Sequence, residues 1–501
     1  MQIDLSSGTG LIVALLPELV LSGWAMVLLL LIAWRHEGEA DTRLAGMVAV
    51  IGLLSTLFLV LWFWAQGAEV LGFSRMVTVD GFRFATAVVF LVGALLAVLL
   101  SLGYLGREQI IVPEYYVLIM LATVGMMFMS GGVDLIVIFL GLELMSLCVY
   151  VLTGVNRRSV FGAEAALKYF LLGAFASGFF LYGIALIYGA TGSTDLDIIR
   201  RQIDGLGLES DLMLRIGIAL LLVGFGFKVA AVPFHMWVPD VYDGAPTPVT
   251  AFMAAAVKAA GFAALIRVLL SGLGPAFVTW SEVVWWLAAI TMVVGNLVAL
   301  SQRRIKRMLA YSSIGHAGYL LTAVASGTEI GAEAFLFYIF AYTLMTMGAF
   351  GILGAVGRDG ERDVLTDDLA GLGRKRPWVA FAMAVCMLSL LGFPGTAGFI
   401  GKWYILYSAV DAGQLTLAVL VVLASAVSAG YYLPVIMAMY MKPPISDSAH
   451  QDMSVVGATR WVIGAVTVAL LALGVWPQPM LDAAKHGVED LSPSVMMVAN
   501  E

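Results

Sequence analysis

The stretch GFGFKVAAVPFHMWVPDVYDGAPTPVTAFMAAAVKAAGF, residues 224–262, decides the fold. An apolar run that carries Lys228 leads into Pro233 and Pro239, and a second apolar run follows with Lys258 inside it. Proline lacks a backbone N–H and interrupts a helix. Membrane helices tolerate such breaks because neighbouring helices satisfy the freed backbone groups. The stretch therefore predicts two transmembrane helices, the first of them discontinuous.

The composition of the whole chain supports a membrane protein. The chain has 501 residues, of which 61% are hydrophobic and 12% charged. A soluble domain cannot hide that much apolar surface, because its outside must face water. The lipid bilayer is therefore the expected surrounding of most of the chain. The net charge of -7 comes mainly from loops, and no basic face for nucleic acid is expected.

Apolar runs of helix length recur along the whole chain. A helix needs about 20 apolar residues to cross a bilayer. The sequence therefore predicts an all-α polytopic membrane protein with about fourteen transmembrane helices, of which the seventh and the twelfth are discontinuous. The predicted spans are 10–34, 44–66, 82–104, 115–131, 133–154, 165–190, 212–234, 248–272, 279–301, 310–326, 331–356, 377–411, 414–441 and 457–479.

Loop charges predict the orientation of these spans. Of the 27 Lys and Arg residues, 16 fall in loops or span ends that follow odd-numbered spans, and 7 fall on the other side. Cytoplasmic loops carry the excess of positive charge. We therefore expect a multi-pass protein of the bacterial inner membrane with both termini on the periplasmic side. The first ten residues lack the positive region of a signal peptide, and 194–211 is expected to form a short surface helix.

An internal repeat is the predicted domain organisation. Gly-Phe recurs at 224–225 and 392–393, an offset of 168 residues, and each pair precedes a break. Each broken span is the fourth of a five-span block, and consecutive blocks with an odd number of spans point in opposite directions. The expected units are a three-helix segment 1–114, the blocks 115–272 and 279–441, and a last helix with a short tail, 457–501.

Four lysines lie inside predicted spans. A lysine at the bilayer centre costs roughly 2.5–3.5 kcal/mol on insertion scales, so its presence favours a function. Lys228 and Lys258 lie deep in their spans, whereas Lys168 is near enough to an end to extend to the surface. Lys402 lies beside the second break. A buried lysine can release its proton and an arginine cannot, as a proton relay requires.

Three further polar features are candidates for the same relay. Glu143 lies inside a span and needs a cationic partner, for which Lys228 and Lys258 are the candidates. His316, in YSSIGHAGY, is either a packed polar residue or a relay element. The proline-rich loop at 239–247 carries two aspartates and no cation, so it either lines a proton entry or forms a rigid turn.

The two cysteines predict neither a metal site nor an iron–sulfur cluster. Cys148 and Cys386 fall inside separate apolar spans and lack the spacing of paired ligands. We expect them to behave as small buried hydrophobic residues.

Several motifs resemble a known family. The runs ALKYFLLGAFASG at 166–178, YDGAPTPVTAFMAAAVKAAGF at 242–262, KRMLAYSSIGHAGY at 306–319 and GFPGTAGFIGKWYI at 392–405 are similar to the antiporter-like membrane subunits of respiratory complex I. Among these the chain most resembles subunit N, the counterpart of mitochondrial subunit 2. The resemblance covers essentially the whole chain. This family is related to subunits of multisubunit cation/proton antiporters.

The resemblance implies a fold and a set of residue roles. It implies fourteen helices with two inverted five-helix units and a buried polar axis that carries protons. By motif, Glu143 resembles a glutamate paired with Lys228, Lys258 the central lysine, and Lys402 a relay residue that is glutamate in subunit M. Subunit L has a long lateral C-terminal helix for which this chain has no room after its last span.

The resemblance also implies an activity and partners. The expected function is proton translocation by the membrane arm of NADH:quinone oxidoreductase, driven by electron transfer in other subunits. No cofactor is implied in this chain, because NADH, flavin, the iron–sulfur clusters and quinone belong to partner subunits. The expected partners are the other membrane subunits of complex I. The alternative is a subunit of a multisubunit Na⁺/H⁺ antiporter or of a membrane-bound hydrogenase.

Overall fold

The computed structural model describes residues 12–34, 42–66, 76–357, 364–444, 455, 457–489 and 491. In this part of the chain the only β-structure is three isolated bridges, and the other elements are helices. The helices before the first break are α2 Leu16–Trp34, α3 Thr42–Gln66, α4 Gly81–Arg107, α5 Glu114–Gly131, α6 Leu135–Thr153, α7 Val160–Thr191, α8 Leu196–Leu206, η2 Leu208–Ser210 and α9 Leu212–Val229. After it come α10 Val238–Gly244, α11 Thr247–Phe252, η3 Met253–Val257, α12 Lys258–Ile266, η4 Arg267–Gly272, η5 Gly274–Ala276, α13 Phe277–Leu300, α14 Ile305–Ala325 and α15 Glu329–Val356. The last are η6 Thr366–Leu369, α16 Leu372–Lys375, α17 Pro377–Leu391, α18 Ala397–Asp411, α19 Leu415–Met441, α20 Ala458–Val475 and α21 Gln478–Val488.

Twelve helices of the described residues are long and apolar enough to cross a membrane. This confirms the predicted all-helical polytopic membrane protein. Two of the predicted crossings do not reach that limit. α14 is 21 residues long but carries two cations and several hydroxyl groups. α17 and α18 have 15 residues each and are separated by a non-helical turn.

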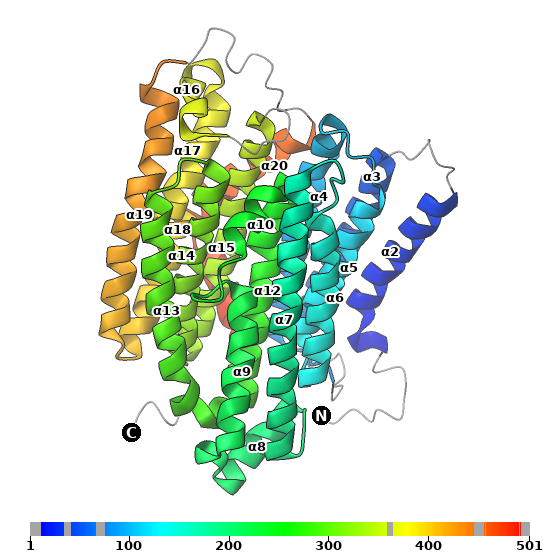
Figure 1. The fold of residues 1–501 in the computed structure, drawn as a ribbon, viewed down its shortest axis with the longest axis vertical. Coiled ribbons are helices and arrows are strands. Elements are labelled where there is room, and N and C mark those ends of the chain that lie inside the picture. Colours follow the sequence, from blue (N-terminus) through cyan, green and yellow to red (C-terminus); the bar gives the residue numbers. More distant parts are fainter. Residues whose placement is uncertain are drawn as a thin grey trace.

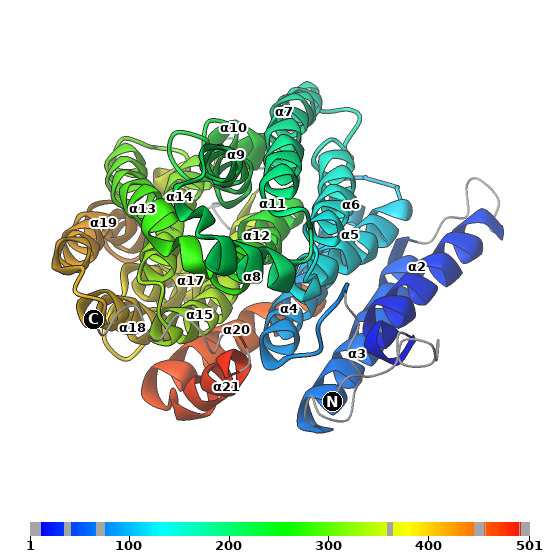
Figure 2. The same cartoon turned by 90° about the horizontal axis from the view of Figure 1, so that it is seen from below.

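The helices form one bundle with a buried centre. α2 and α3 lie at one edge and α19 at the opposite edge, with α4, α12 and α15 between them (Figures 1 and 2). Every residue from 247 to 270 of the continuous helical segment Thr247–Gly272, which includes α11 and α12, is buried. A polar side chain buried in this way needs a hydrogen-bond partner from another element or from a bound molecule.

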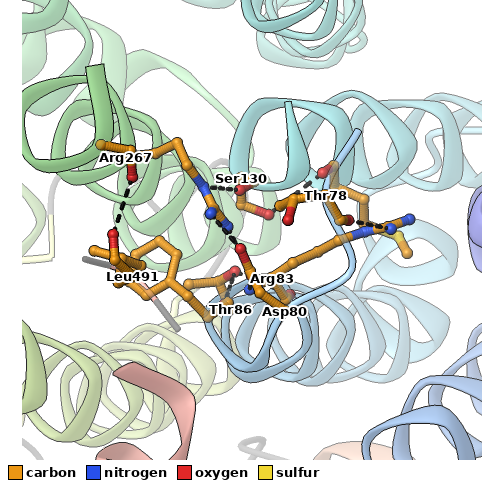
Figure 3. A network of polar contacts seen from close by, with 10 residues as sticks. Thr78, Asp80, Arg83, Thr86, Ser130, Arg267 and Leu491 are labelled. Carbon is orange, nitrogen blue, oxygen red and sulfur yellow. Dashed lines mark hydrogen bonds and ion pairs between the residues drawn. The ribbon is translucent and has the colours of Figure 1, made fainter. Parts of the chain in front are cut away.

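One end of the bundle carries α8 and the other carries α16; we call them the lower and the upper end, as they stand in Figure 1. At the lower end, Arg83 donates hydrogen bonds to both carboxylate oxygens of Glu18 at 2.7 Å. Arg267 donates to Asp80 at 2.9 Å and to the Ser130 carbonyl at 2.9 Å (Figure 3). All four charged side chains are buried.

Both arginines of these ion pairs are more deeply buried than the count of loop charges indicates. The charge count places Arg83 and Arg267 among the cations of loops and span ends, and in the structure each is 2% exposed. The pairs tie α2 to α4, and the N-cap of α4 to η4. The predicted surface helix at 194–211 is confirmed as α8, whose N-cap Asp195 accepts two backbone hydrogen bonds.

Both predicted breaks are present. α9 ends before Ala230, which has a left-handed φ of 63°, and α17 ends before Gly392, with a φ of 87°. Glycine is required at position 392, because a Cβ there would lie 2.9 Å from Cδ of Lys402. The recurring Gly-Phe pairs do not mark equivalent positions: 224–225 lie inside α9, whereas 392–393 follow the end of α17.

Two of the isolated bridges have the same arrangement. Asp134 pairs with Asp195 at the lower end, and Arg304 pairs with Leu365 at the upper end. Each joins the start of the second helix of a predicted five-span block to the segment after the third helix. Both residues of the second bridge lie 170 positions after their counterparts in the first, as the residue numbers show. The two bridges are thus 170 positions apart, whereas the Gly-Phe pairs are 168 positions apart.

Candidate functional site

Lys228 lies in the last turn of α9, directly before the break. Its Nζ donates to the Ser146 hydroxyl at 2.6 Å and to the Tyr150 hydroxyl at 3.3 Å, and both acceptors lie on α6. The ammonium also lies 5.4 Å from the centre of the Tyr150 ring. The side chain is 4% exposed, as expected for a lysine deep in its span. Its hydrogen-bond partners are neutral hydroxyl groups.

Lys258 lies at the centre of the molecule, on the buried helix. It begins α12 immediately after η3, a π-helical turn, and such turns recur at functional sites. Its Nζ donates to the carbonyl of Ser313 at 2.5 Å and is hydrogen-bonded to the hydroxyl of the same residue. Gly261, one turn further on, would place a Cβ 3.5 Å from Cβ of Lys228, so the two lysines stand on neighbouring turns of packed helices.

Lys402 lies on α18, just after the second break. Its Nζ donates to the Leu391 carbonyl at 2.9 Å and to the Ser425 hydroxyl at 3.0 Å. Because α17 ends at Leu391, the carbonyl of this residue has no intrahelical hydrogen bond and can accept one from the lysine. The ammonium lies 4.7 Å from the centre of the Tyr319 ring. The break therefore supplies a partner for Lys402.

His316 joins the second and third of these lysines. Its Nδ1 lies 2.5 Å from the Tyr338 hydroxyl and its Nε2 lies 3.0 Å from the Tyr432 hydroxyl. The Tyr342 ring, which faces Lys258, is 5.0 Å from the His316 ring, and the Tyr319 ring, which faces Lys402, is 5.5 Å away. The histidine is 1% exposed. The structure thus brings Lys258, His316 and Lys402 into one continuous polar and aromatic cluster.

Glu143 lies on α6 at the periphery of this cluster. It is partly buried and hydrogen-bonds to the Ser177 hydroxyl of α7. In the described part of the chain it forms no ion pair with Lys228, although the two charges are close enough to interact. Ser146, the partner of Lys228, lies one turn after Glu143 on the same helix face. The direct pairing of Glu143 with Lys228 stays a prediction.

Lys168 is separate from the buried lysines. Its side chain is 43% exposed and forms ion pairs with Glu164 at 2.8 Å and Asp240 at 2.9 Å. Burial raises the pKa of Asp240, but its contacts with Lys168 and Arg307 outweigh burial and hold that pKa below its usual value. These charges line a small cleft of about 110 Å³ between α7, α10 and α14. Lys168 reaches the surface, which was one of its two expected positions.

The same cleft contains the proline-rich loop. Asp240 pairs with Arg307 at 3.1 Å and Asp243 pairs with Arg304 at 3.2 Å. The second carboxylate oxygen of Asp243 is buried and has no hydrogen-bond partner among the described residues. Most of the predicted loop is the short helix α10, which ion pairs join to α7 and α14 and which also offers this buried polar atom. Its role as a proton entry stays a prediction.

Several residues of this site were not expected from the sequence. Lys306, counted among the loop cations, is 3% exposed and donates to the Ala245 carbonyl at 2.9 Å. Ser313 and His316 follow Lys306 by seven and ten positions, so all three lie near one face of α14. This helical spacing is visible in the sequence and could have identified Lys306. The tyrosines around His316 come from three helices, so no spacing in the sequence predicts that they meet. They are Tyr319, Tyr338, Tyr342 and Tyr432.

The chemistry of the cluster suits proton exchange. Hydroxyl groups can both donate and accept, so serine and tyrosine partners can serve a charged or a neutral lysine. In the described ranges no group of three or more His, Cys, Asp or Glu residues could hold a metal ion. Both cysteines are buried, as predicted.

A family model gives the first comparison. The model described as "NADH:quinone oxidoreductase/Mrp antiporter, TM" matches residues 132–428, more than half of the chain. The matched region begins just before α6 and ends within α19, so it includes every buried lysine described above.

Curated relatives and solved structures give the second comparison. NADH-quinone oxidoreductase subunit N of Gemmatimonas aurantiaca is 48% identical, over 98% of this chain and 96% of the relative. Subunit N of Trichlorobacter lovleyi is 48% identical over 95% and 96%. A chain of respiratory complex I from Thermus thermophilus superposes with a TM-score of 0.80 at 38% identity, covering 94% of this chain and 100% of that one. A chain of the Mrp complex from a Dietzia species has a TM-score of 0.82 at 23% identity over 96% and 98%, a likeness of fold.

Proposed function

The chain belongs to the family of NADH-quinone oxidoreductase subunit N, the antiporter-like, proton-translocating subunit of the complex I membrane arm, and on this premise we propose that its protons pass along Lys228, Lys258, His316 and Lys402. As a part of respiratory complex I it is a multi-pass membrane protein that works with other subunits. The alternative assignment to an antiporter is not favoured, because that likeness is one of fold at 23% identity.

One observation carries this proposal: the three lysines of the path, Lys228, Lys258 and Lys402, have neutral hydrogen-bond partners. Within the described residues none of them forms an ion pair, and their hydrogen bonds go to serine and tyrosine hydroxyls and to backbone carbonyls. A lysine that loses its proton beside a carboxylate strands a buried negative charge. A lysine beside hydroxyls does not, because the hydroxyl can turn and donate to the neutral amine. Both charge states of each lysine are therefore accommodated.

His316 couples the two halves of the path. A charge on Lys258 or Lys402 disfavours a second positive charge nearby, so a proton gained by one of the three groups favours the loss of a proton from another. Two tyrosine hydroxyls flank the imidazole, and each can reverse its hydrogen bond when the ring gains or loses a proton. In this proposal His316 passes protons between the lysines, and the charge of Glu143 is coupled to that of Lys228.

The chain forms two inverted repeats in this proposal, with fourteen membrane crossings. The twelve long apolar helices are joined by α14 and by the pair α17 and α18, which together make one interrupted crossing. The offset of 170 residues between the two equivalent bridges supports the repeats. Packing supports them too, because α5 packs on α6 as α13 packs on α14, and α7 on α9 as α15 on α18.

This offset relates the two polar sites residue by residue. Ser313, the partner of Lys258, lies 170 positions after Glu143 and is therefore its equivalent in the second repeat. The same offset places His316 at the position of Ser146, the partner of Lys228. Equivalent turns of α6 and α14 thus hold the acceptors for successive lysines, which supports one path through both repeats.

The proposed orientation puts the upper end in the cytoplasm and both termini in the periplasm of a bacterial inner membrane. The excess of positive charge in the upper loops supports it. Electron transfer from NADH to quinone in the partner subunits would drive the charge changes. We propose that NADH, flavin, iron–sulfur clusters and quinone are bound there, and that this chain contributes residues for proton movement.

Two substitutions at Lys258 test the path. Lys258→Arg keeps the charge but cannot release a proton, so the complex should assemble while its proton pumping falls at least about tenfold. Lys258→Ala should also assemble and pump poorly. Inverted membrane vesicles give the amount of complex, the rate of NADH oxidation and the proton gradient for each variant. Lys442→Arg, at an exposed lysine, is the matched control and should pump normally.

Each result has a clear meaning. Normal pumping by Lys258→Arg would refute proton release at this position. If both Lys258 variants fail to assemble while the control assembles, Lys258 has a structural role. Low pumping in assembled complexes, with NADH oxidation lowered in parallel, is the outcome that the proposal predicts.

A further inference from the structure

A second polar site lies at the upper end of the bundle, away from the lysine path. It is a cavity of about 580 Å³ between α3, α4, α11, α15 and α20, which we call the upper cavity. Volumes of this order are typical of small-molecule sites. The residues that line it come from both ends of the sequence, and none of the residues proposed for proton transfer is among them.

Two arginines and a helix start give the upper cavity a positive wall. Arg43 at the start of α3 and Arg107 at the end of α4 both line it. Arg107 lies over the Tyr104 ring at 5.5 Å and pairs with Glu108 at 3.0 Å, so its guanidinium is held in place. The N-terminus of α20, at Gly457 and the residue after it, also lines the cavity and has no side-chain cap. Arginine and helix N-termini both bind phosphate groups.

A buried hydroxyl in the same wall has no partner. Thr247 is 1% exposed and lines the upper cavity, and its Oγ1 forms no hydrogen bond with any residue that the structure describes. Buried polar groups are nearly always hydrogen-bonded, so an unpartnered one indicates a bound molecule. The hydroxyl can donate to a phosphate oxygen.

The rest of the wall is apolar. Met47, Leu100 and Phe350 contribute side chains from three helices, and the glycines of α15 add backbone surface. Free phosphate makes no use of such a surface, whereas a phospholipid presents both an anionic group and acyl chains. Basic pockets between membrane helices on the cytoplasmic side bind anionic lipid headgroups.

We propose that the upper cavity binds one anionic phospholipid, with its phosphate between Arg43, Arg107 and Thr247 and its acyl chains against the apolar wall. The lipid contacts the start of the buried helix. Thr247 is the first residue of α11, and Lys258 follows eleven positions later on the same continuous helical segment. The bound lipid therefore fixes the end of the segment that carries the central lysine.

Site-specific protection of a cysteine tests this inference. Thr459→Cys introduces a thiol in the cavity wall, while both native cysteines are buried. The intact complex is placed in nanodiscs of phosphatidylglycerol or of phosphatidylcholine, and subunit N is separated after labelling with N-ethylmaleimide. Labelling should be on the order of tenfold slower in phosphatidylglycerol. Ala458→Cys, in the same wall, serves if Thr459→Cys does not assemble.

Controls separate the site from general surface charge. Ser301→Cys, at another exposed position of the upper end, should label at the same rate in both lipids. The double variant Arg43→Gln/Arg107→Gln should abolish protection, and Thr247→Val should weaken it severalfold. Arg157→Gln/Arg158→Gln removes the same charge from exposed positions of the same end and should leave protection unchanged.

Three outcomes would overturn the inference. Equal labelling in the two lipids would show that no anionic lipid binds here. Protection that survives the Arg43→Gln/Arg107→Gln change would place the lipid elsewhere. Equal protection by millimolar inorganic phosphate in phosphatidylcholine discs would identify free phosphate, and not a lipid, as the ligand.

Discussion

At the scale of the residue, the site depends on lysines whose partners are neutral. Inserting a lysine in a membrane costs energy that only a partner or a function offsets. Lys228, Lys258 and Lys402 each find a hydroxyl within hydrogen-bond distance. Hydroxyls accept from an ammonium and donate to an amine, so they leave both charge states possible. A carboxylate in the same place would hold the proton.

The one acid near the path is predicted to tune it. Glu143→Gln keeps the side-chain shape and removes a carboxylate charge near Lys228. The complex should assemble, and its proton pumping and NADH oxidation should fall together, because the charges of neighbouring groups in the path are coupled. Vesicle assays of both rates measure this. Glu209→Gln, at an exposed acid of the lower end, is the control, and wild-type rates for both variants would mean that Glu143 has no relay role.

At the scale of the element, the helix breaks supply partners that intact helices would not. A break frees the carbonyls of the preceding turn. At the second break, the Leu391 carbonyl accepts from Lys402. At the first, the Phe227 carbonyl accepts from the indole of Trp237 at 3.1 Å. The two breaks therefore have similar backbones and different polar partners.

Glycine at the second break is predicted to serve Lys402 directly. A residue other than glycine in the left-handed region costs about 1–2 kcal/mol. Gly392 and Gly395 have the same φ of 87°, but only a Cβ at position 392 meets Lys402, at 2.9 Å, and nothing lies within 4 Å of a Cβ at position 395. Gly392→Ala should therefore lower both stability and pumping, whereas Gly395→Ala should lower stability alone.

Thermal dissociation of the subunit from the purified complex and the proton gradient in vesicles measure these two effects. The comparison cancels the shared backbone strain, because both substitutions place alanine at the same φ. If the two variants pump equally per assembled complex, the contact between Gly392 and Lys402 does not matter for proton transfer.

At the scale of the whole molecule, buried ion pairs join α2 to α4 and α4 to the buried central helix. Arg267 belongs to the helix of Lys258, and Asp80 caps α4 (Figure 3). Removing one partner of a buried pair leaves an uncompensated charge and typically costs about 3–5 kcal/mol. Asp80→Leu should therefore destabilise the subunit strongly.

The double variant Asp80→Leu/Arg267→Met should recover most of that loss, because it leaves no buried charge. The measurement is the amount of subunit N that remains in the complex as urea is increased. Equal losses in the single and the double variant would show that the ion pair is not what joins these helices.

The orientation of the whole molecule is a separate prediction. A reporter that is active only in the cytoplasm should be inactive when fused after Glu501 and active when inserted after Pro444, because the two positions belong to opposite ends of the bundle in the proposed topology. Measuring the activity of both fusions tests the charge rule in this chain. Activity of the fusion after Glu501 and inactivity of the insertion after Pro444 would contradict the proposed orientation and place the upper end in the periplasm.

The sequence by itself determined the class of the fold, most of its helices and its deepest charges. Helix length, apolar composition and the prolines and glycines of the two breaks act locally, through backbone hydrogen bonds and through exclusion of water, so they can be read along the chain. Lys258 was identified in this way, since no position on its own helix offers it water. The resemblance to known subunits came from the same local motifs.

Only the tertiary structure decided which groups meet. Ser313 lies 55 residues from Lys258, and Arg83 lies 65 residues from Glu18, so their contacts follow from the packing of helices and leave no local pattern. Lys306 stands at the start of its helix, and the sequence could not tell that α10 would cover it and bury its charge. Lys168 lies at the surface, where it forms ion pairs with acids of α7 and α10. Burial depends on which faces of the helices pack together, and packing is decided by the whole bundle at once.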